Sequence, residues 1–112
     1  SNYTLGGELL AKALAKTPDL DGVFCTNDDI AIGAMMYAQA HGFNVPKQLS
    51  IVGYNALDIG QAISPKLTSV DSPRHEIGKK SAELLIHALA GERSEQNVFD
   101  LGFTISQGES LN

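Results

Sequence analysis

Two kinds of apolar pattern alternate along the chain, and together they predict alternating helices and strands. Apolar residues at helical spacing predict three helices, and short apolar runs bounded by turn residues predict strands. The predicted helices cover about residues 4–16, 28–40 and 73–90, and their expected caps are Thr4, Asn27 or Asp28, and Ser72. The predicted strands cover residues 23–25, 50–54, 67–71, 98–101 and 103–105. This order is typical of an α/β fold, a parallel sheet with strand–helix–strand crossovers.

Residues 21–55 form the clearest strand–helix–strand unit. The first strand, Val23–Cys25, is apolar throughout, which suits a strand covered on both faces. Gly33 lies inside the predicted helix, where we expect it to permit the close approach of another backbone. The two strands of the unit should run parallel, joined by a right-handed crossover.

Polar residues follow both strands of this unit. Thr26 and Asn27 follow the first strand, while Asn55 follows the second, with Tyr54 and Asp58 nearby. Small ligands bind at the carboxyl ends of parallel strands, and amides offer the donors and acceptors that sugar hydroxyls require. Two interpretations stay open: these residues bind a ligand, or Asn27 only caps its helix and Asn55 only forms a turn.

Composition and charge exclude several kinds of site. The 112 residues carry a formal net charge of −5, which is unsuited to holding duplex DNA by its phosphates. Cys25 is the only cysteine and is expected to be a core thiol, and the three histidines lie in separate elements. No apolar run approaches the roughly 20 residues of a membrane span. We therefore expect no metal, no cofactor and no membrane association.

A catalytic set is also missing. The sequence has no phosphate-binding glycine motif and no nucleophile elbow. The adjacent acids Asp28 and Asp29 could form an acid–base or metal pair, but they equally suit the positive N-terminal end of a helix. A sugar-acid hydrolase would have to use these two acids with His41, and it would lack a nucleophile. We expect no enzymatic activity.

A series of motifs in a fixed order resembles a known family. The five motifs are strand–N-D–helix at residues 23–40, G-x-x-V-P at 42–46, S-x-V-G-Y-N at 50–55, P-x-L-T-S-V at 65–70 and P-x-x-x-I-G at 73–78. The series, over about residues 4–92, resembles the C-terminal part of the effector-binding domain of lactose-repressor-type transcription regulators. Residues 58–61, 72–74 and 100–104 further resemble the gluconate- and idonate-responsive repressors.

The resemblance implies a bacterial, cytoplasmic repressor with a two-lobed, periplasmic-binding-protein-like effector domain. An effector between the lobes, a sugar or a sugar acid such as gluconate, would change the affinity for operator DNA. Residues 1–70 and 103–112 would belong to the C-terminal lobe, and residues 71–102 would return to the N-terminal lobe. The DNA-binding domain would lie outside this chain, which begins without an initiator Met and is expected to be part of a longer protein.

The resemblance also implies residue roles. Asn27 and Asn55 match effector contacts, and Thr26, Tyr54, Asp58 and Ser72 are further candidates for the ligand site. Homodimer contacts would come from the second helix and the loop after residue 58, through Ile30, Ala34, Met35, Ala38, Ile63 and Pro65.

Departures from the family pattern bear on the effector. Asn55 stands where an Asp is usual, which removes a charged acceptor of sugar hydroxyls. A sugar-acid carboxylate needs a cation. Lys66 and Arg74 are the nearest candidates, but we expect the cation to come from the part of the effector domain upstream of this chain.

One competing function shares the fold. A periplasmic sugar-binding protein of a transport system would have the same architecture. A signal peptide upstream would favour that protein, and a helix-turn-helix upstream would favour the repressor.

Overall fold

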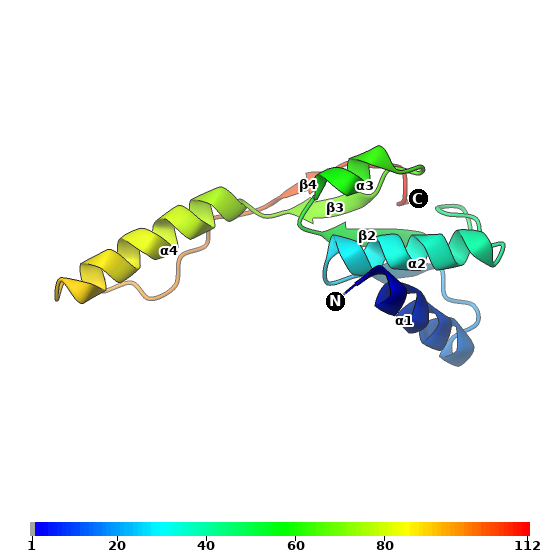
Figure 1. The fold of residues 1–112 in the computed structure, drawn as a ribbon, viewed down its shortest axis with the longest axis horizontal. Coiled ribbons are helices and arrows are strands. Elements are labelled where there is room, and N and C mark those ends of the chain that lie inside the picture. Colours follow the sequence, from blue (N-terminus) through cyan, green and yellow to red (C-terminus); the bar gives the residue numbers. More distant parts are fainter. Residues whose placement is uncertain (1) are drawn as a thin grey trace. The chain divides into compact units, whose positions relative to one another are not determined.

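The computed structural model describes residues 2–112, which fold as two compact units. The first unit contains the chain up to Asp71 together with Thr104–Asn112, and the second contains Ser72–Phe103. Each unit is described by itself below (Figure 1).

The first unit is built on a four-stranded sheet in the order β1-β2-β3-β4. The strands are β1 (Gly22–Phe24), β2 (Ser50–Tyr54), β3 (Thr68–Asp71) and β4 (Thr104–Ser106). The first three run parallel, with Phe24 opposite Val52 and Tyr54 opposite Val70, while β4 runs antiparallel to β3. The predicted α/β class and the parallel pairing within residues 21–55 are confirmed.

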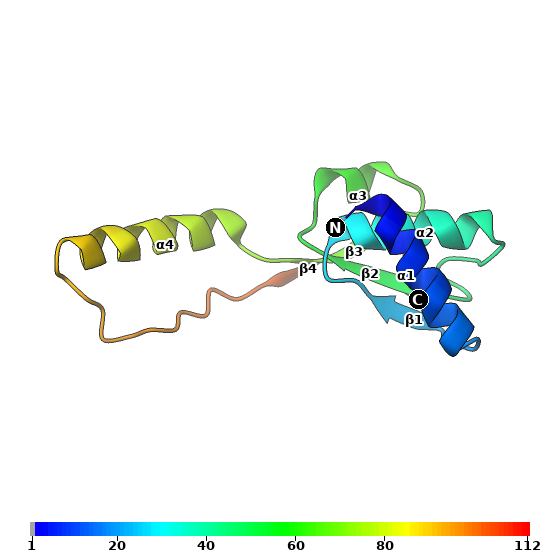
Figure 2. The same cartoon turned by 60° about the horizontal axis from the view of Figure 1, so that its bottom comes forward.

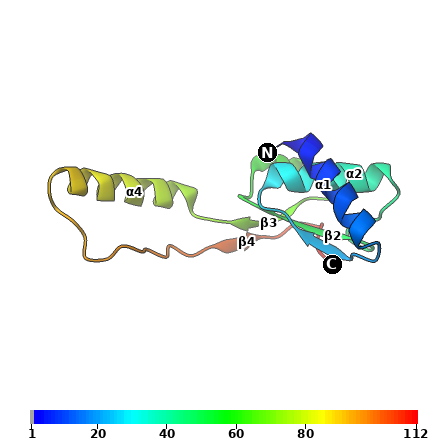
Figure 3. The same cartoon turned by 90° about the horizontal axis from the view of Figure 1, so that it is seen from below.

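Helices α1 (Tyr3–Lys16) and α2 (Asp28–Ala40) lie on the same side of this sheet (Figures 2 and 3), and a short α3 (Asp58–Ala62) follows β2. The core between helices and sheet is apolar because α2 turns its stripe inward and the strands contribute short apolar runs. Its buried members are Leu10, Cys25, Ile30, Ala31, Ile32, Ala34, Met35, Ala38, Leu49, Ile51 and Leu67.

Two glycines permit α1 and α2 to cross closely. A Cβ on Gly33 would lie 1.8 Å from the backbone oxygen of Tyr3, and one on Gly6 would lie 2.2 Å from the backbone oxygen of Ile30. No side chain fits at either distance, so the backbones meet directly. The expectation for Gly33 is confirmed, and Gly6 has the same role on the partner helix.

Helices α1 and α2 each begin with an asparagine side-chain cap, and one of these two caps differs from the sequence expectation. Asn27 caps α2 as predicted, its Oδ1 accepting from the Ile30 N–H at 2.9 Å. Helix α1 begins earlier than expected, because Asn2 and not Thr4 provides the cap, accepting from the Leu5 N–H at 2.7 Å.

The segment after β4 closes the amino ends of β2 and β3. Ser110 is fully buried there; its Oγ accepts from the Thr68 N–H at 2.9 Å and donates to the Ile51 carbonyl oxygen at 2.5 Å. The Ile51 N–H donates to the Ser110 carbonyl oxygen. A single residue therefore bridges two strands 42 and 59 positions away in the chain.

The second unit consists of α4 (Arg74–Leu89) and the segment that follows it. The predicted cap at Ser72 is wrong: Pro73 occupies the cap position without a side-chain hydrogen bond, and the Arg74 N–H donates to the Ser72 carbonyl oxygen. The predicted strand at residues 98–101 is also wrong, since these residues pair with no strand of the described chain. No residue of α4 is buried.

Candidate functional site

The candidate site is the edge of the sheet where β1, β2 and β3 end. Because these strands are parallel and in register, the residues that follow them come to the same edge. Asn27 follows β1, Asn55 follows β2, and Asp71 is the last residue of β3. The structure therefore brings together the two asparagines that the sequence singled out.

Asn55 lies in a turn whose backbone is held by its surroundings. Asn55 and Ala56 have φ values of +109° and +51°, in the region that favours glycine. The N–H of Asn55 donates to the Val70 carbonyl oxygen at 2.9 Å. The side-chain amide of Asn55 makes no hydrogen bond within residues 2–112, so both its donor and acceptor groups are available.

The side chain of Asp28 holds this turn through hydrogen bonds, a role that the sequence did not predict. Its side chain is 0% exposed. Its Oδ2 accepts from the Leu57 N–H at 2.6 Å, and its Oδ1 accepts from the Ser69 hydroxyl at 2.6 Å. The Ser69 Oγ accepts in turn from the Ala56 N–H at 3.0 Å. The carboxylate is thus a buried acceptor that joins the start of α2, the turn after β2 and strand β3.

The remaining predicted ligand residues are Thr26, Tyr54, Asp58 and Ser72. Thr26 is exposed two residues after the end of β1, Tyr54 is the half-buried last residue of β2, and Asp58 is the exposed first residue of α3. Ser72 is the first residue of the second unit and so is not part of the edge described for the first.

The predicted pairing residues on α2 are buried inside the unit. Ile30, Ala34, Met35 and Ala38 are each 8% exposed or less, because the apolar stripe of α2 packs against α1 and the sheet. These four side chains offer no surface to a partner, which corrects the expectation drawn from the apolar stripe. Met36, 60% exposed, and the exposed Gln39 are on the outer side of α2.

The loop after α3 lies beside this outer side of α2. The Gln39 Nε2 donates to the Ser64 carbonyl oxygen at 3.1 Å. Ile63 and Pro65, on either side of Ser64, are half-buried. Helix and loop therefore form one continuous surface.

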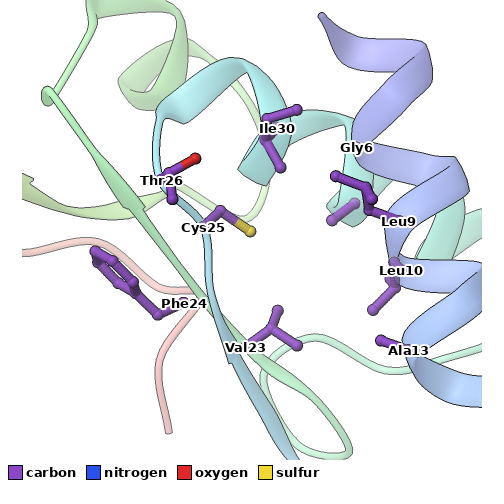
Figure 4. A pocket seen from close by; sticks show the side chains of 10 residues that line it. Gly6, Leu9, Leu10, Ala13, Val23, Phe24, Cys25, Thr26 and Ile30 are labelled. Atoms are coloured by element: carbon purple, nitrogen blue, oxygen red, sulfur yellow. The ribbon is translucent and has the colours of Figure 1, made fainter. Parts of the chain in front are cut away.

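The first unit also has an apolar cavity of about 230 Å³ between α1 and β1 (Figure 4). Figure 4 shows Val23 of β1, and Cys25 directly after that strand, facing Leu10 of α1 across it. Its lining is almost entirely apolar, with the Thr26 hydroxyl as the polar exception. Sugars need several convergent polar groups, so this cavity does not suit them.

Burial keeps the Cys25 thiol protonated. Cys25 is 7% exposed, and burial raises its pKa from 9.0 to about 11. The thiolate is the nucleophilic form. The expectation of a core thiol is confirmed by its place in the apolar core.

The arrangement is unsuited to hydrolase chemistry by Asp28, Asp29 and His41. His41 follows the last residue of α2, about 20 Å along the helix from Asp28 at 1.5 Å per residue. Asp28 is closed off by its two hydrogen bonds. Residues 2–112 contain no group of three His, Cys, Asp or Glu side chains placed to hold a metal ion.

Cations lie away from the candidate edge in the first unit. Lys66 precedes β3 and is therefore at the amino edge of the sheet, which removes it as a partner for a carboxylate at the other edge. Lys16 and Lys47 likewise precede β1 and β2, and Lys12 is on α1. Arg74 belongs to the second unit.

Comparison with known proteins identifies the family. Residues 2–111 match the periplasmic binding protein-like domain. Over 111 residues, 99% of this chain, the sequence is 45% identical to the HTH-type transcriptional regulator GntR and 43% identical to the HTH-type transcriptional regulator IdnR, both of Escherichia coli K12. The chain spans about a third of the length of these curated relatives, 34% and 33% respectively.

Solved structures agree with this result. The transcription regulator GntR of Chromobacterium violaceum is 40% identical with a TM-score of 0.85, the match covering 98% of this chain and 41% of that one. A complex of the transcriptional regulator CelR with cellobiose is 29% identical with a TM-score of 0.89, covering 97% and 33%.

The relatives are transcription regulators and not enzymes, in agreement with the expectation of no enzymatic activity. Every helix within residues 2–112 is too short or too polar to cross a membrane. The resemblance to lactose-repressor-type regulators, and to GntR and IdnR among them, is confirmed by the identities of 40–45%. The chain belongs to the periplasmic binding protein-like domain family, in the form that these regulators carry.

Proposed function

We propose that this chain is the effector-sensing part of a bacterial transcription repressor, and that its effector is a sugar acid such as gluconate. The observation that carries the proposal is the carboxyl edge of the sheet, where Asn55 presents an uncommitted amide from a turn fixed to the residue after Asn27. An amide on a rigid turn suits the recognition of vicinal hydroxyls, since it donates and accepts at a defined position.

The comparisons support the kind of protein. The relatives are regulators, which favours a repressor over a transport protein of the same fold. Regulators of similar structure have been solved with carbohydrates, one with cellobiose and one with lactose. For this chain, operator binding would require a domain outside it, and the action would take place in the bacterial cytoplasm.

The two compact units suggest how the effector domain is divided. We assign residues up to 71 and residues 104–112 to one lobe, and residues 72–103 to the chain that passes to the other lobe. After Asn27 and Asn55, the further proposed effector contacts are Thr26, Tyr54, Asp58 and Ser72.

The carboxylate of a sugar acid requires a cation that the first unit does not place at this edge. The lysines of residues 2–71 that precede β1, β2 and β3 lie at the opposite edge or on α1. We therefore assign the carboxylate partner to the other lobe, where an Arg could bind it in a bidentate manner.

Pairing of two protomers would use the outer side of α2 and the neighbouring loop. Met36, Gln39, Ile63 and Pro65 form a continuous, partly apolar surface. An isologous dimer through such a surface is the commonest oligomer of soluble proteins.

A thermal-shift series tests the effector class. In the complete regulator of which we propose this chain is a part, gluconate should raise the melting temperature in proportion to the logarithm of its concentration above the dissociation constant. Glucose is the matched neutral control and should give a smaller shift. A series of sugar acids and sugars that leaves the melting temperature unchanged would contradict the proposal.

A further inference from the structure

We propose that Asp28 is the positioning residue of the effector site: its buried carboxylate fixes the 55–57 turn to the start of α2 and never touches the effector. The inference rests on the proposed function in one respect, namely that an effector binds at this edge of the sheet. The contacts that carry it stand independently of any ligand.

The turn needs an outside support because its backbone is disfavoured. Asn55 and Ala56 are consecutive residues with positive φ, and neither is a glycine. Non-glycine residues stay in this region only where the surroundings over-determine them. Three successive N–H groups, those of Asn55, Ala56 and Leu57, bond outside the turn.

One carboxylate accounts for two of these three bonds. Asp28 accepts from Leu57 directly and from the Ser69 hydroxyl, which itself accepts from Ala56. Asp28 and Ser69 are 0% and 1% exposed, so neither bond competes with water. The turn is therefore held by a network that begins at the first residue of α2.

The space around the carboxylate excludes a ligand. A Cβ on Gly53 would lie 2.3 Å from Asp28 Oδ1, and a Cβ on Gly60 would lie 3.9 Å from its Oδ2. The chain closes around both oxygens, and a side chain at position 53 would displace the Asp28 Oδ1. Asp28 can influence an effector only through the residues that it places.

Those residues are the two candidate contacts. Asn27 precedes Asp28 in the chain, and Asn55 precedes the two amides that Asp28 holds. The network thus sets the separation between Asn27 and Asn55. Loosening it should weaken effector binding without unfolding the sheet.

Asp28→Asn and Ser69→Ala test the proposal, with Ser110→Ala as the matched control. Ser110 is also a buried serine that bridges β2 and β3, but at the opposite edge of the sheet. Asp28→Asn replaces one acceptor oxygen with a donor NH₂ group that faces an N–H or O–H. Ser69→Ala removes the acceptor for Ala56 and is the milder change where Asp28→Asn does not fold.

The first measurement is amide hydrogen exchange on the 112-residue chain without ligand. The Ala56 amide should exchange at least tenfold faster in both test variants, and the Leu57 amide at least tenfold faster in Asp28→Asn. The amides of β2 should keep their protection, and Ser110→Ala should leave Ala56 and Leu57 unchanged. Unchanged exchange at Ala56 and Leu57 in both test variants overturns the proposal.

The second measurement is the affinity of the complete regulator for gluconate, at a temperature where every variant is folded. Asp28→Asn and Ser69→Ala should raise the dissociation constant at least tenfold, and Ser110→Ala at most twofold. A loosened turn with unchanged affinity overturns the positioning role. Absence of binding by the unaltered regulator counts against the proposed function, while the exchange result still decides whether Asp28 holds the turn.

Discussion

Gly53 supports the candidate site by having no side chain. It lies in β2 directly below the turn, and the Asp28 carboxylate occupies the space that a Cβ would fill. The residue type at position 53 therefore decides whether the carboxylate can reach Leu57 and Ser69. The same network depends on two residues 25 positions apart in the sequence.

Gly53→Ala should lower the free energy of unfolding by about 1–3 kcal/mol, because the new methyl group collides with Asp28 Oδ1. Urea denaturation of the chain measures the change. Gly22→Ala in β1 is the control, since its nearest neighbour would be 3.8 Å away, and it should change the value by less than about 1 kcal/mol. Equal effects of the two substitutions would contradict the described packing.

Cys25 should make stability depend on alkaline pH. Burial raises the pKa of its thiol from 9.0 to about 11, so the unfolded chain loses this proton at a lower pH than the folded chain. The stabilising contribution is complete below pH 9 and is lost as the pH rises towards 11. Between these values the free energy of unfolding should fall by about 1–3 kcal/mol more than in Cys25→Ala.

Urea denaturation at pH 8, 9, 10 and 11 measures this difference, and subtraction of the Cys25→Ala series isolates the contribution of the Cys25 thiol. Parallel pH profiles of the two proteins would show that the thiol is not desolvated. Thiol reagents should also react slowly with the folded chain at neutral pH.

At this scale the sequence predicted where Asn27 and Asn55 lie but not what supports them. Asn27 and Asn55 could be predicted because a residue after a parallel strand has a known place in the fold. The role of Asp28 could not be predicted, because its hydrogen-bond partners Leu57 and Ser69 lie 29 and 41 residues away in the sequence. An acid at a helix start is already explained by the positive N-terminal end of the helix. Only the folded chain shows that Asp28 also holds the turn after β2.

Among the elements, the crossing of α1 and α2 depends most on single residues. The two helices contact through backbone at Gly6 and Gly33. Glycine lowers helix stability by about 1 kcal/mol relative to alanine, and the close crossing offsets this loss through the packing of the apolar stripe of α2.

Gly33→Ala should destabilise the chain by about 3 kcal/mol or more, since the methyl group would meet the Tyr3 backbone, which cannot rotate away. Gly78→Ala in α4 is the matched control, because nothing lies within 4 Å of its Cβ position. That change should raise helicity and stabilise α4 by about 0.5–1 kcal/mol. Circular dichroism during thermal unfolding distinguishes the two outcomes, and a stabilising Gly33→Ala would refute the close crossing.

Periodicity predicted most elements, and tertiary contacts explain the failures. Helices α1 and α2 and strands β1 to β3 appear within a few residues of their predicted positions. Residues 98–101 carry strand-forming residues but find no partner strand among the described residues, so they remain irregular. The prediction that Ser72 caps α4 is wrong because Pro73 occupies the cap position itself.

At the scale of the whole molecule, apolar side chains of the second unit are left exposed. Leu85, Ile86 and Leu89 on α4 are 61%, 66% and 80% exposed. Surfaces of this kind favour association. The isolated 112-residue chain should therefore self-associate.

Light scattering should give a mass above the 11.9 kDa of one chain. Leu85→Glu combined with Leu89→Glu should lower that mass, because it places charge in the apolar stripe. Glu83→Gln on the same helix should leave it unchanged. A well-folded, strictly monomeric unaltered chain would count against this expectation.

Ordered motifs predicted the family of the molecule, because several weak signals in the right order are specific together. The same signals gave no account of the carboxylate partner, since the lysines of the first unit lie away from the candidate edge. They also placed the pairing surface on the apolar stripe of α2, which the structure buries. Periodicity identifies an apolar face but not whether core or partner covers it.

Isothermal titration of gluconate into the complete regulator, unaltered and with Asn55→Ala, tests the central claim most directly. Loss of one hydrogen-bonding amide should weaken binding at least tenfold, about 1.4 kcal/mol or more. Asn44→Ala, an exposed amide in the loop before β2, should leave affinity within twofold. Affinity for gluconate that is unchanged by Asn55→Ala would contradict the assignment of this edge of the sheet as the effector site.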